Sequence, residues 1–117
     1  TKDKSKAFIL DYKTSKKNKW RKTRSNIAQD LQLRTYGLVV NKTFGIAPEN
    51  IRGALFYLEG GEIIDARFTQ DSLDAAGEEL LHAYKQIQGT KPGDVWGNPG
   101  NHCMRCEFAG ICPFFGG

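Results

Sequence analysis

The pattern of apolar and polar positions divides the chain into a small α/β domain and an irregular tail. A short apolar run predicts a strand over about residues 6–13, and two runs rich in aliphatic and β-branched residues predict strands at 51–58 and 63–68. Gly60-Gly61 separates the last two runs and is a strong hairpin signal. The pattern therefore predicts a sheet in which the first strand and the later hairpin combine.

Two further segments carry apolar residues at helical spacing. The first is predicted to begin near Ser25, a plausible cap, and to run to about residue 42, with Gly45 and Pro48 ending it. Its expected buried stripe consists of Ile27, Leu31, Leu38 and Val39. The second is predicted over about 72–88, before Gly89. Its apolar side would hold Leu73, Ala76, Leu80, Tyr84 and Ile87.

The periodicity disappears after Lys91, and all three cysteines of the chain follow within ten residues. Cys103, Cys106 and Cys112 are spaced closely enough to share a metal ion or a cluster, whereas a Cys103–Cys106 disulfide is less attractive in a reducing compartment. Three thiolates leave a tetrahedral zinc or a four-iron cluster one ligand short. His102, a water or a cysteine outside this sequence could supply the fourth ligand, and the spacing alone does not identify the metal.

Composition is that of a soluble globular chain, with 39% hydrophobic and 26% charged residues among 117. We expect one domain, with a core over 1–90 and a Cys-rich tail over 91–117. No stretch has the length of a membrane-spanning helix, and the N-terminus does not resemble a secretory signal, so we expect a cytoplasmic protein without membrane partners.

The net charge of +4 is unevenly distributed, because residues 1–24 hold ten basic residues against two acidic ones. Cations release counterions from phosphates, and an aromatic ring can stack on an unpaired base, so we predict a nucleic-acid contact in the segment that ends at Arg24. The alternatives are a solvated loop whose charge serves solubility, and a core position for the tryptophan. The predicted contact residues are Lys16, Lys17, Lys19, Trp20, Arg21, Lys22 and Arg24.

Asp11 and Lys13 lie two positions apart at the end of the first predicted strand. Because side chains alternate between faces, both should project to one side, about 6 to 7 Å apart along the strand. A divalent metal could bind at Asp11 while Lys13 holds a water or stabilises developing negative charge, which is what cleavage of a phosphodiester requires. Alone, the pair would also suit an ordinary exposed strand end.

With these motifs the chain resembles the PD-(D/E)XK nucleases, and within them the RecB, AddB and CRISPR-associated group that carries an iron-sulfur cluster. Asp11 is similar to the second metal-binding carboxylate of that family and Lys13 to its catalytic lysine. Gln32 and Tyr36 match its Gln-x3-Tyr motif and lie one turn apart on a helix. The three cysteines match the C-terminal cysteines of the cluster-bearing group.

The resemblance implies a restriction-endonuclease-like α/β fold, a mixed sheet flanked by helices, and a metal-dependent DNA exonuclease acting in recombination or repair. It implies Mg2+ or Mn2+ at Asp11, with the carbonyl of Tyr12 as a further ligand, and a 4Fe-4S cluster, or alternatively Zn2+, on the cysteines. Single-stranded DNA or a duplex end would be the substrate, with a helicase or recombination protein as a possible partner.

The family also has a metal-binding carboxylate on a preceding strand, which has no counterpart here if Asp3 lies in the connecting turn. The chain therefore looks like the C-terminal part of a nuclease domain, and we expect little or no activity from these 117 residues alone. Two other functions stay open: a noncatalytic DNA-binding module of a helicase-nuclease, and a small zinc-binding interaction domain.

Overall fold

The computed structural model describes residues 2, 5–14 and 22–115. A compact unit comprises residues 1–83, and a second comprises 84–117. The first contains strand β1 (Ala7–Lys13), helix α1 (Leu31–Phe44), strand β2 (Ile51–Tyr57) and strand β3 (Glu62–Arg67). Helix α2 (Gln70–Gly89) begins in the first unit and ends in the second. The predicted small α/β architecture, a mixed sheet with two helices, is confirmed.

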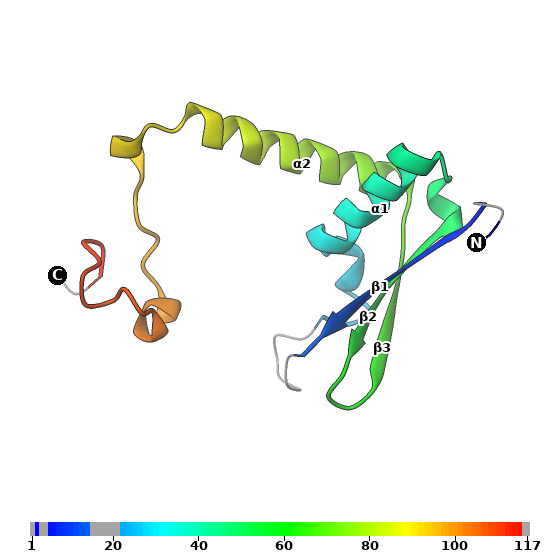
Figure 1. Ribbon diagram of the computed structural model, residues 1–117, viewed down its shortest axis with the longest axis horizontal. Helices are drawn as coiled ribbons and strands as arrows, with labels where there is room; N and C mark the ends of the chain where they lie inside the picture. Colours follow the sequence, from blue (N-terminus) through cyan, green and yellow to red (C-terminus); the bar gives the residue numbers. More distant parts are fainter. Residues whose placement is uncertain (1, 3–4, 15–21, 116–117) are drawn as a thin grey trace. The chain divides into compact units, whose positions relative to one another are not determined.

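The sheet has the order β1-β2-β3, with β1 parallel to β2 and β2 antiparallel to β3 (Figure 1). Helix α1 provides the crossover between the two parallel strands, as parallel pairing requires. Gly60 and Gly61 both have positive φ, at 93° and 64°, and turn the chain between β2 and β3. The predicted hairpin is therefore confirmed, and the carboxyl ends of β1 and β2 meet at one edge of the sheet.

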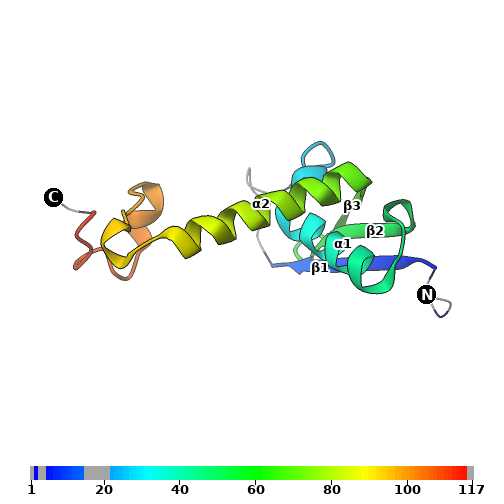
Figure 2. The ribbon, with the colours of Figure 1, turned by 90° about the horizontal axis from the view of Figure 1, so that it is seen from above.

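One face of the sheet carries the core of this unit. Ile51 and Leu55 of β2 pack with Leu33 of α1 and Leu73 of α2, and each of these four side chains is almost fully buried. In Figure 2 helix α1 lies along the sheet, next to the first turns of α2. The opposite face exposes Phe8 and Tyr12 of β1, so β1 alternates between a packed face and an open one.

Helix α1 begins later than predicted. The segment after Ser25 forms a short 3-10 helix, Ile27–Gln29, and Asp30 is the N-cap, its side chain accepting a hydrogen bond from the Leu33 amide. An aspartate stops the helix from extending backward because its carboxylate satisfies an amide that has no helical partner. Gly45 ends α1 in the left-handed conformation, with φ of 66°, as its position predicted.

The predicted apolar stripes are only partly buried. In α1 the buried positions are Leu33 and Gly37, whereas Val39 is 55% exposed. In α2 only Leu73 and Ala76 are buried. The three later apolar residues of the stripe are exposed: Leu80, Tyr84 and Ile87.

The second unit has two short 3-10 helices, Pro92–Asp94 and Asn101–Arg105, and otherwise irregular backbone. Trp96 and Phe114 pack against each other with ring centroids 6.4 Å apart, and Phe114 lies directly over Gly97. This contact joins the two ends of the Cys-rich tail. Over the described ranges of the chain, no helix combines the length and apolar character needed to cross a lipid bilayer.

Candidate active site

Asp11 and Lys13 lie on the packed face of β1 and contact each other. The Lys13 Nζ atom is 2.7 Å from Asp11 Oδ2, and both side chains are partly buried. The burial of β1 alternates residue by residue, so the two side chains project to the side on which α1 packs. The predicted juxtaposition of acid and amine is therefore present at the carboxyl end of the strand.

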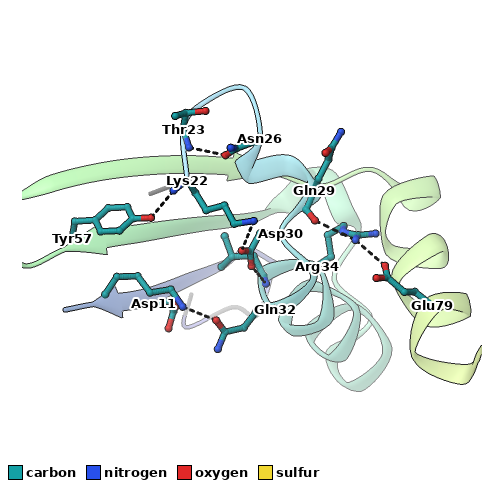
Figure 3. Close-up of polar contacts among 12 residues, drawn as sticks. Asp11, Lys22, Thr23, Asn26, Gln29, Asp30, Gln32, Arg34, Tyr57 and Glu79 are labelled. Carbon is teal, nitrogen blue, oxygen red and sulfur yellow. Dashed lines mark hydrogen bonds and ion pairs between the residues drawn. The ribbon is translucent and has the colours of Figure 1, made fainter. Parts of the chain in front are cut away.

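Helix α1 extends this pair into a connected set of polar side chains. Lys13 Nζ donates to Gln32 Oε1 at 2.7 Å, a contact marked beside α1 in Figure 3. Gln32 Nε2 in turn donates to the Tyr36 hydroxyl at 2.9 Å, as residues one helical turn apart can do. Asp11, Lys13, Gln32 and Tyr36, which we call the β1–α1 polar set, thus form one chain of contacts.

The surroundings of Lys13 favour its charged form. The contact with the Asp11 carboxylate is the largest influence and raises the pKa of Lys13 above its ordinary value, although partial burial acts in the opposite direction. The negative charge of Asp30 and the nearby Tyr57 raise it further. Lys13 is consequently held as an ammonium ion through the neutral pH range.

Asp11 suits a weakly held divalent metal. Its Oδ2 atom is shielded from water and has no well-aligned hydrogen bond among the described residues, so the adjacent ammonium is its main compensation. Within those residues no group of three His, Cys, Asp or Glu side chains gathers that could hold a metal ion. Mg2+ commonly binds through one or two carboxylates together with waters and substrate phosphates, so a single carboxylate fits an incomplete site of that kind.

Two residues near this set were not predicted from the sequence, Asp30 and Tyr57, and both contact Lys22. Asp30 is buried at the start of α1, Lys22 Nζ lies 3.7 Å from Asp30 Oδ2, and the Lys22 amide donates to the Tyr57 hydroxyl at 2.9 Å (Figure 3). Asp30 could have been found, because an aspartate directly before a helical pattern is a cap signal. Tyr57 could not, since its partner is 35 residues away.

A second polar cluster ties α1 to α2. Arg34 Nη2 donates to Glu79 Oε2 at 3.0 Å and to the Gln29 carbonyl at 3.3 Å (Figure 3). Arg34 is two positions from Gln32 and therefore lies on a different side of the helix. We interpret this cluster as structural.

Most of the predicted nucleic-acid contact lies outside the described residues. Lys22 is half-buried beside Asp30, and Arg24 is exposed. The remaining predicted contacts fall in the part that is not described: Lys16, Lys17, Lys19, Trp20 and Arg21.

The three cysteines are free thiols that the structure does not bring together. Cys103 and Cys112 are half-buried, Cys106 is exposed, and none of them belongs to a metal-binding group within the described chain. The main-chain amide of Gly100 points to Cys103 Sγ at 3.4 Å. This arrangement does not fit a cluster without movement of the tail, so a cysteine-bound metal stays a prediction from the spacing.

Comparison with known families decides the relationship that these residues suggest. The model of the PD-(D/E)XK nuclease superfamily matches residues 1–113. The chain belongs to this superfamily. No curated protein matches the chain significantly in sequence.

Membership in a nuclease superfamily implies a nucleic-acid substrate, and PD-(D/E)XK nucleases typically use divalent metal ions. The match covers almost the whole chain, including the β1–α1 polar set. The superfamily match does not distinguish the iron-sulfur group from its other branches.

Proposed function

We propose that this protein is a metal-dependent deoxyribonuclease of the exonuclease type, acting on a single strand or a duplex end in recombination or repair. One observation carries the proposal: in a chain of this superfamily, the acid and amine of β1 face the helix that bears Gln32 and Tyr36, and all four side chains are connected. Such an arrangement is preorganised around one point at the sheet edge.

Asp11 would hold Mg2+ or Mn2+, with the main-chain carbonyl of Tyr12 as a second oxygen ligand. When bound, the ion would polarise the scissile phosphoryl group and favour deprotonation of an attacking water. Because no group of three His, Cys, Asp or Glu side chains gathers among the described residues, further ligands would come from water, from the substrate and from other carboxylates.

Lys13 would stabilise the negative charge that develops on the phosphate, or position the nucleophilic water. Its ammonium donates to Gln32 and contacts Asp11, which leaves a donor that can point toward the substrate. Gln32 fixes the direction of the ammonium, and Tyr36 accepts from Gln32 and so fixes the amide. Gln32 and Tyr36 are therefore positioning residues in this mechanism.

The basic segment from Lys16 to Arg24 would bind the DNA backbone. In sequence it begins three residues after Lys13, the last residue of β1 and a member of the β1–α1 polar set. The support for this role is the charge and the nearby tryptophan, which could stack on an unpaired base.

We also propose that Cys103, Cys106 and Cys112 bind a 4Fe-4S cluster as a structural element, with Zn2+ as the alternative metal. The spacing supports this, and so does the scarcity of buried apolar residues in the tail, where Trp96 and Ile111 are each more than 80% exposed. Segments that lack a core often fold around a metal instead.

A noncatalytic DNA-binding module is the second candidate, favoured because the described residues contain no group of three potential metal ligands. A metal requirement separates the two functions. We expect the full-length protein to degrade DNA with Mg2+ or Mn2+ but not with EDTA, and Asp11→Asn to reduce the rate by a factor of about a hundred or more. Lys42→Gln, which changes an exposed lysine at the other end of α1, should leave the rate unchanged. DNA binding without any metal-dependent cleavage would favour the module, and full activity of Asp11→Asn would refute the assigned site.

A further inference from the structure

Lys22 is held at two points beside the β1–α1 polar set. Its main-chain amide donates to the Tyr57 hydroxyl at the end of β2, and its ammonium lies 3.7 Å from Asp30 Oδ2 at the start of α1 (Figure 3). Tyr57 is 2% exposed, so the hydroxyl that accepts from Lys22 belongs to a buried residue. The position of Lys22 is thus set by both elements that frame the candidate active site.

The segment that follows Lys22 is folded by local hydrogen bonds. The Thr23 amide donates to Asn26 Oδ1 at 2.7 Å, and the Ile27 amide donates to the Thr23 carbonyl at 2.9 Å. Ile27 is buried in the core and is followed by the N-cap residue Asp30. Lys22 therefore lies at the beginning of a hydrogen-bonded segment that leads to the start of α1.

Among the described residues, the ammonium of Lys22 is attracted by Asp30 but makes no hydrogen bond to it. A separation of 3.7 Å is too long for a hydrogen bond, and the Lys22 side chain is 42% exposed. Lys13 differs, because it has two close partners at 2.7 Å. Lys22 is oriented by charge while its three donors can still bind an anion.

Lys22 and Lys13 also lie at the same end of the sheet. Lys13 is the register partner of Tyr57 in the parallel pair, and Tyr57 holds the Lys22 backbone. An anion bound by Lys13 at this end of the sheet is therefore close to a second cation, the Lys22 ammonium. A polymer with regularly spaced phosphates has the right chemistry to engage both.

We propose that Lys22 binds a backbone phosphate next to the scissile one, and that Asp30 and Tyr57 are positioning residues that aim Lys22 at it. This assignment rests on the proposed function and adds to it which phosphate Lys22 binds and the two residues that act through Lys22. The contacts that hold Lys22, to Tyr57 and Asp30, come from residues of the described fold itself.

Asp30→Asn provides a test, because a positioning role and simple electrostatics predict opposite changes in the affinity for DNA. Asparagine can still accept from the Leu33 amide, so the cap is retained while the negative charge is removed. If charge alone mattered, removing a carboxylate beside DNA would tighten binding. If Asp30 aims Lys22, binding should weaken although the protein has become more positive.

The experiment measures binding of a fluorescent single-stranded oligonucleotide to the full-length protein in EDTA, over a range of salt concentrations. For Lys22→Gln we expect the affinity for DNA to fall about threefold to fivefold for every sequence tested. We also expect the slope of log K against log salt to become less negative by about 0.7. Tyr57→Phe removes only the hydroxyl. Both Tyr57→Phe and Asp30→Asn should also lower the affinity and weaken its dependence on salt. Lys42→Gln serves as the charge-matched control, and circular dichroism checks that each variant is folded.

The outcomes separate this assignment from the proposed function. Weaker binding and a smaller salt slope in all three variants, with the control unchanged, support it. Tighter or unchanged binding by Asp30→Asn, or a wild-type slope in Lys22→Gln, overturns it and leaves the nuclease assignment intact. Failure of the wild-type protein to bind DNA would instead overturn the proposed function itself.

Discussion

The side chain of Lys13 connects the strand to the helix at the candidate active site. Its amine contacts Asp11 on its own strand and donates to Gln32 on α1. The alternation of side chains along β1 puts acid and amine on one face, which is why this juxtaposition could be predicted from a two-residue spacing. The contacts of Lys22 with Tyr57 and Asp30 depend on how distant segments meet, so no local pattern could reveal them.

The pKa of Lys13 gives a prediction at the residue scale. In the metal-free protein Asp11→Asn should lower this pKa, because the largest influence that favours the ammonium form is removed. Asp30→Asn should lower it by less, since Asp30 acts only through its more distant charge. Loss of the proton therefore moves to lower pH in both variants.

Lysine-selective NMR titration measures these values in the variants and in Glu79→Gln, whose carboxylate contacts Arg34 instead. That control should behave like the wild type. An unchanged Lys13 pKa in Asp11→Asn would mean that the two side chains do not interact in solution.

Helix α1 is the element that positions half of the site, and it packs closely against its neighbours at the buried residue Gly37. A Cβ atom there would lie 3.0 Å from Leu73 Cδ2 and 3.3 Å from the ring of Phe68. The buried positions of α1 are thus Leu33 and Gly37, neither of which belongs to the predicted apolar stripe. Glycine normally weakens a helix, so its use here reflects packing that single-residue propensities do not contain.

Gly37→Val should therefore destabilise the domain by about 1 to 3 kcal/mol through overpacking against Leu73 and Phe68. Urea unfolding measures the change. Gly89→Val is the matched control, since no atom lies within 4 Å of a Cβ added at that position, and its unfolding midpoint should not fall. Equal midpoints for the two variants would show that α1 can move away without cost.

At the scale of the whole molecule, the order of elements was predictable and their depth of burial was not. Each predicted strand and helix exists, because alternation, helical spacing and glycine turns are local signals. Exposure of Tyr84 and Ile87 shows the limit, since an apolar stripe does not state whether a surface is there to cover it. Likewise the cysteine spacing cannot show whether the thiols converge.

The Cys-rich tail provides a prediction at this scale. We expect anaerobically purified full-length protein to contain iron and to absorb light at about 400 nm. The Cys106→Ser variant should lose both the iron and the absorbance. Metal analysis and absorbance spectra measure the outcome, with Met104→Leu as a control at an exposed position between two of the cysteines. Bound zinc without iron would identify the alternative metal, and no bound metal would contradict the predicted ligand role.

In the proposed function, Lys13 acts in the chemical step at a site built by β1 and α1. The most direct test is the single-turnover rate of DNA cleavage by the full-length protein at saturating protein and Mg2+, for the wild type and Lys13→Gln. We predict a loss of about a hundredfold to a thousandfold in rate, with the affinity for DNA changed only a few-fold. A Lys13→Gln rate close to that of the wild type would show that Lys13 does not act in the chemical step.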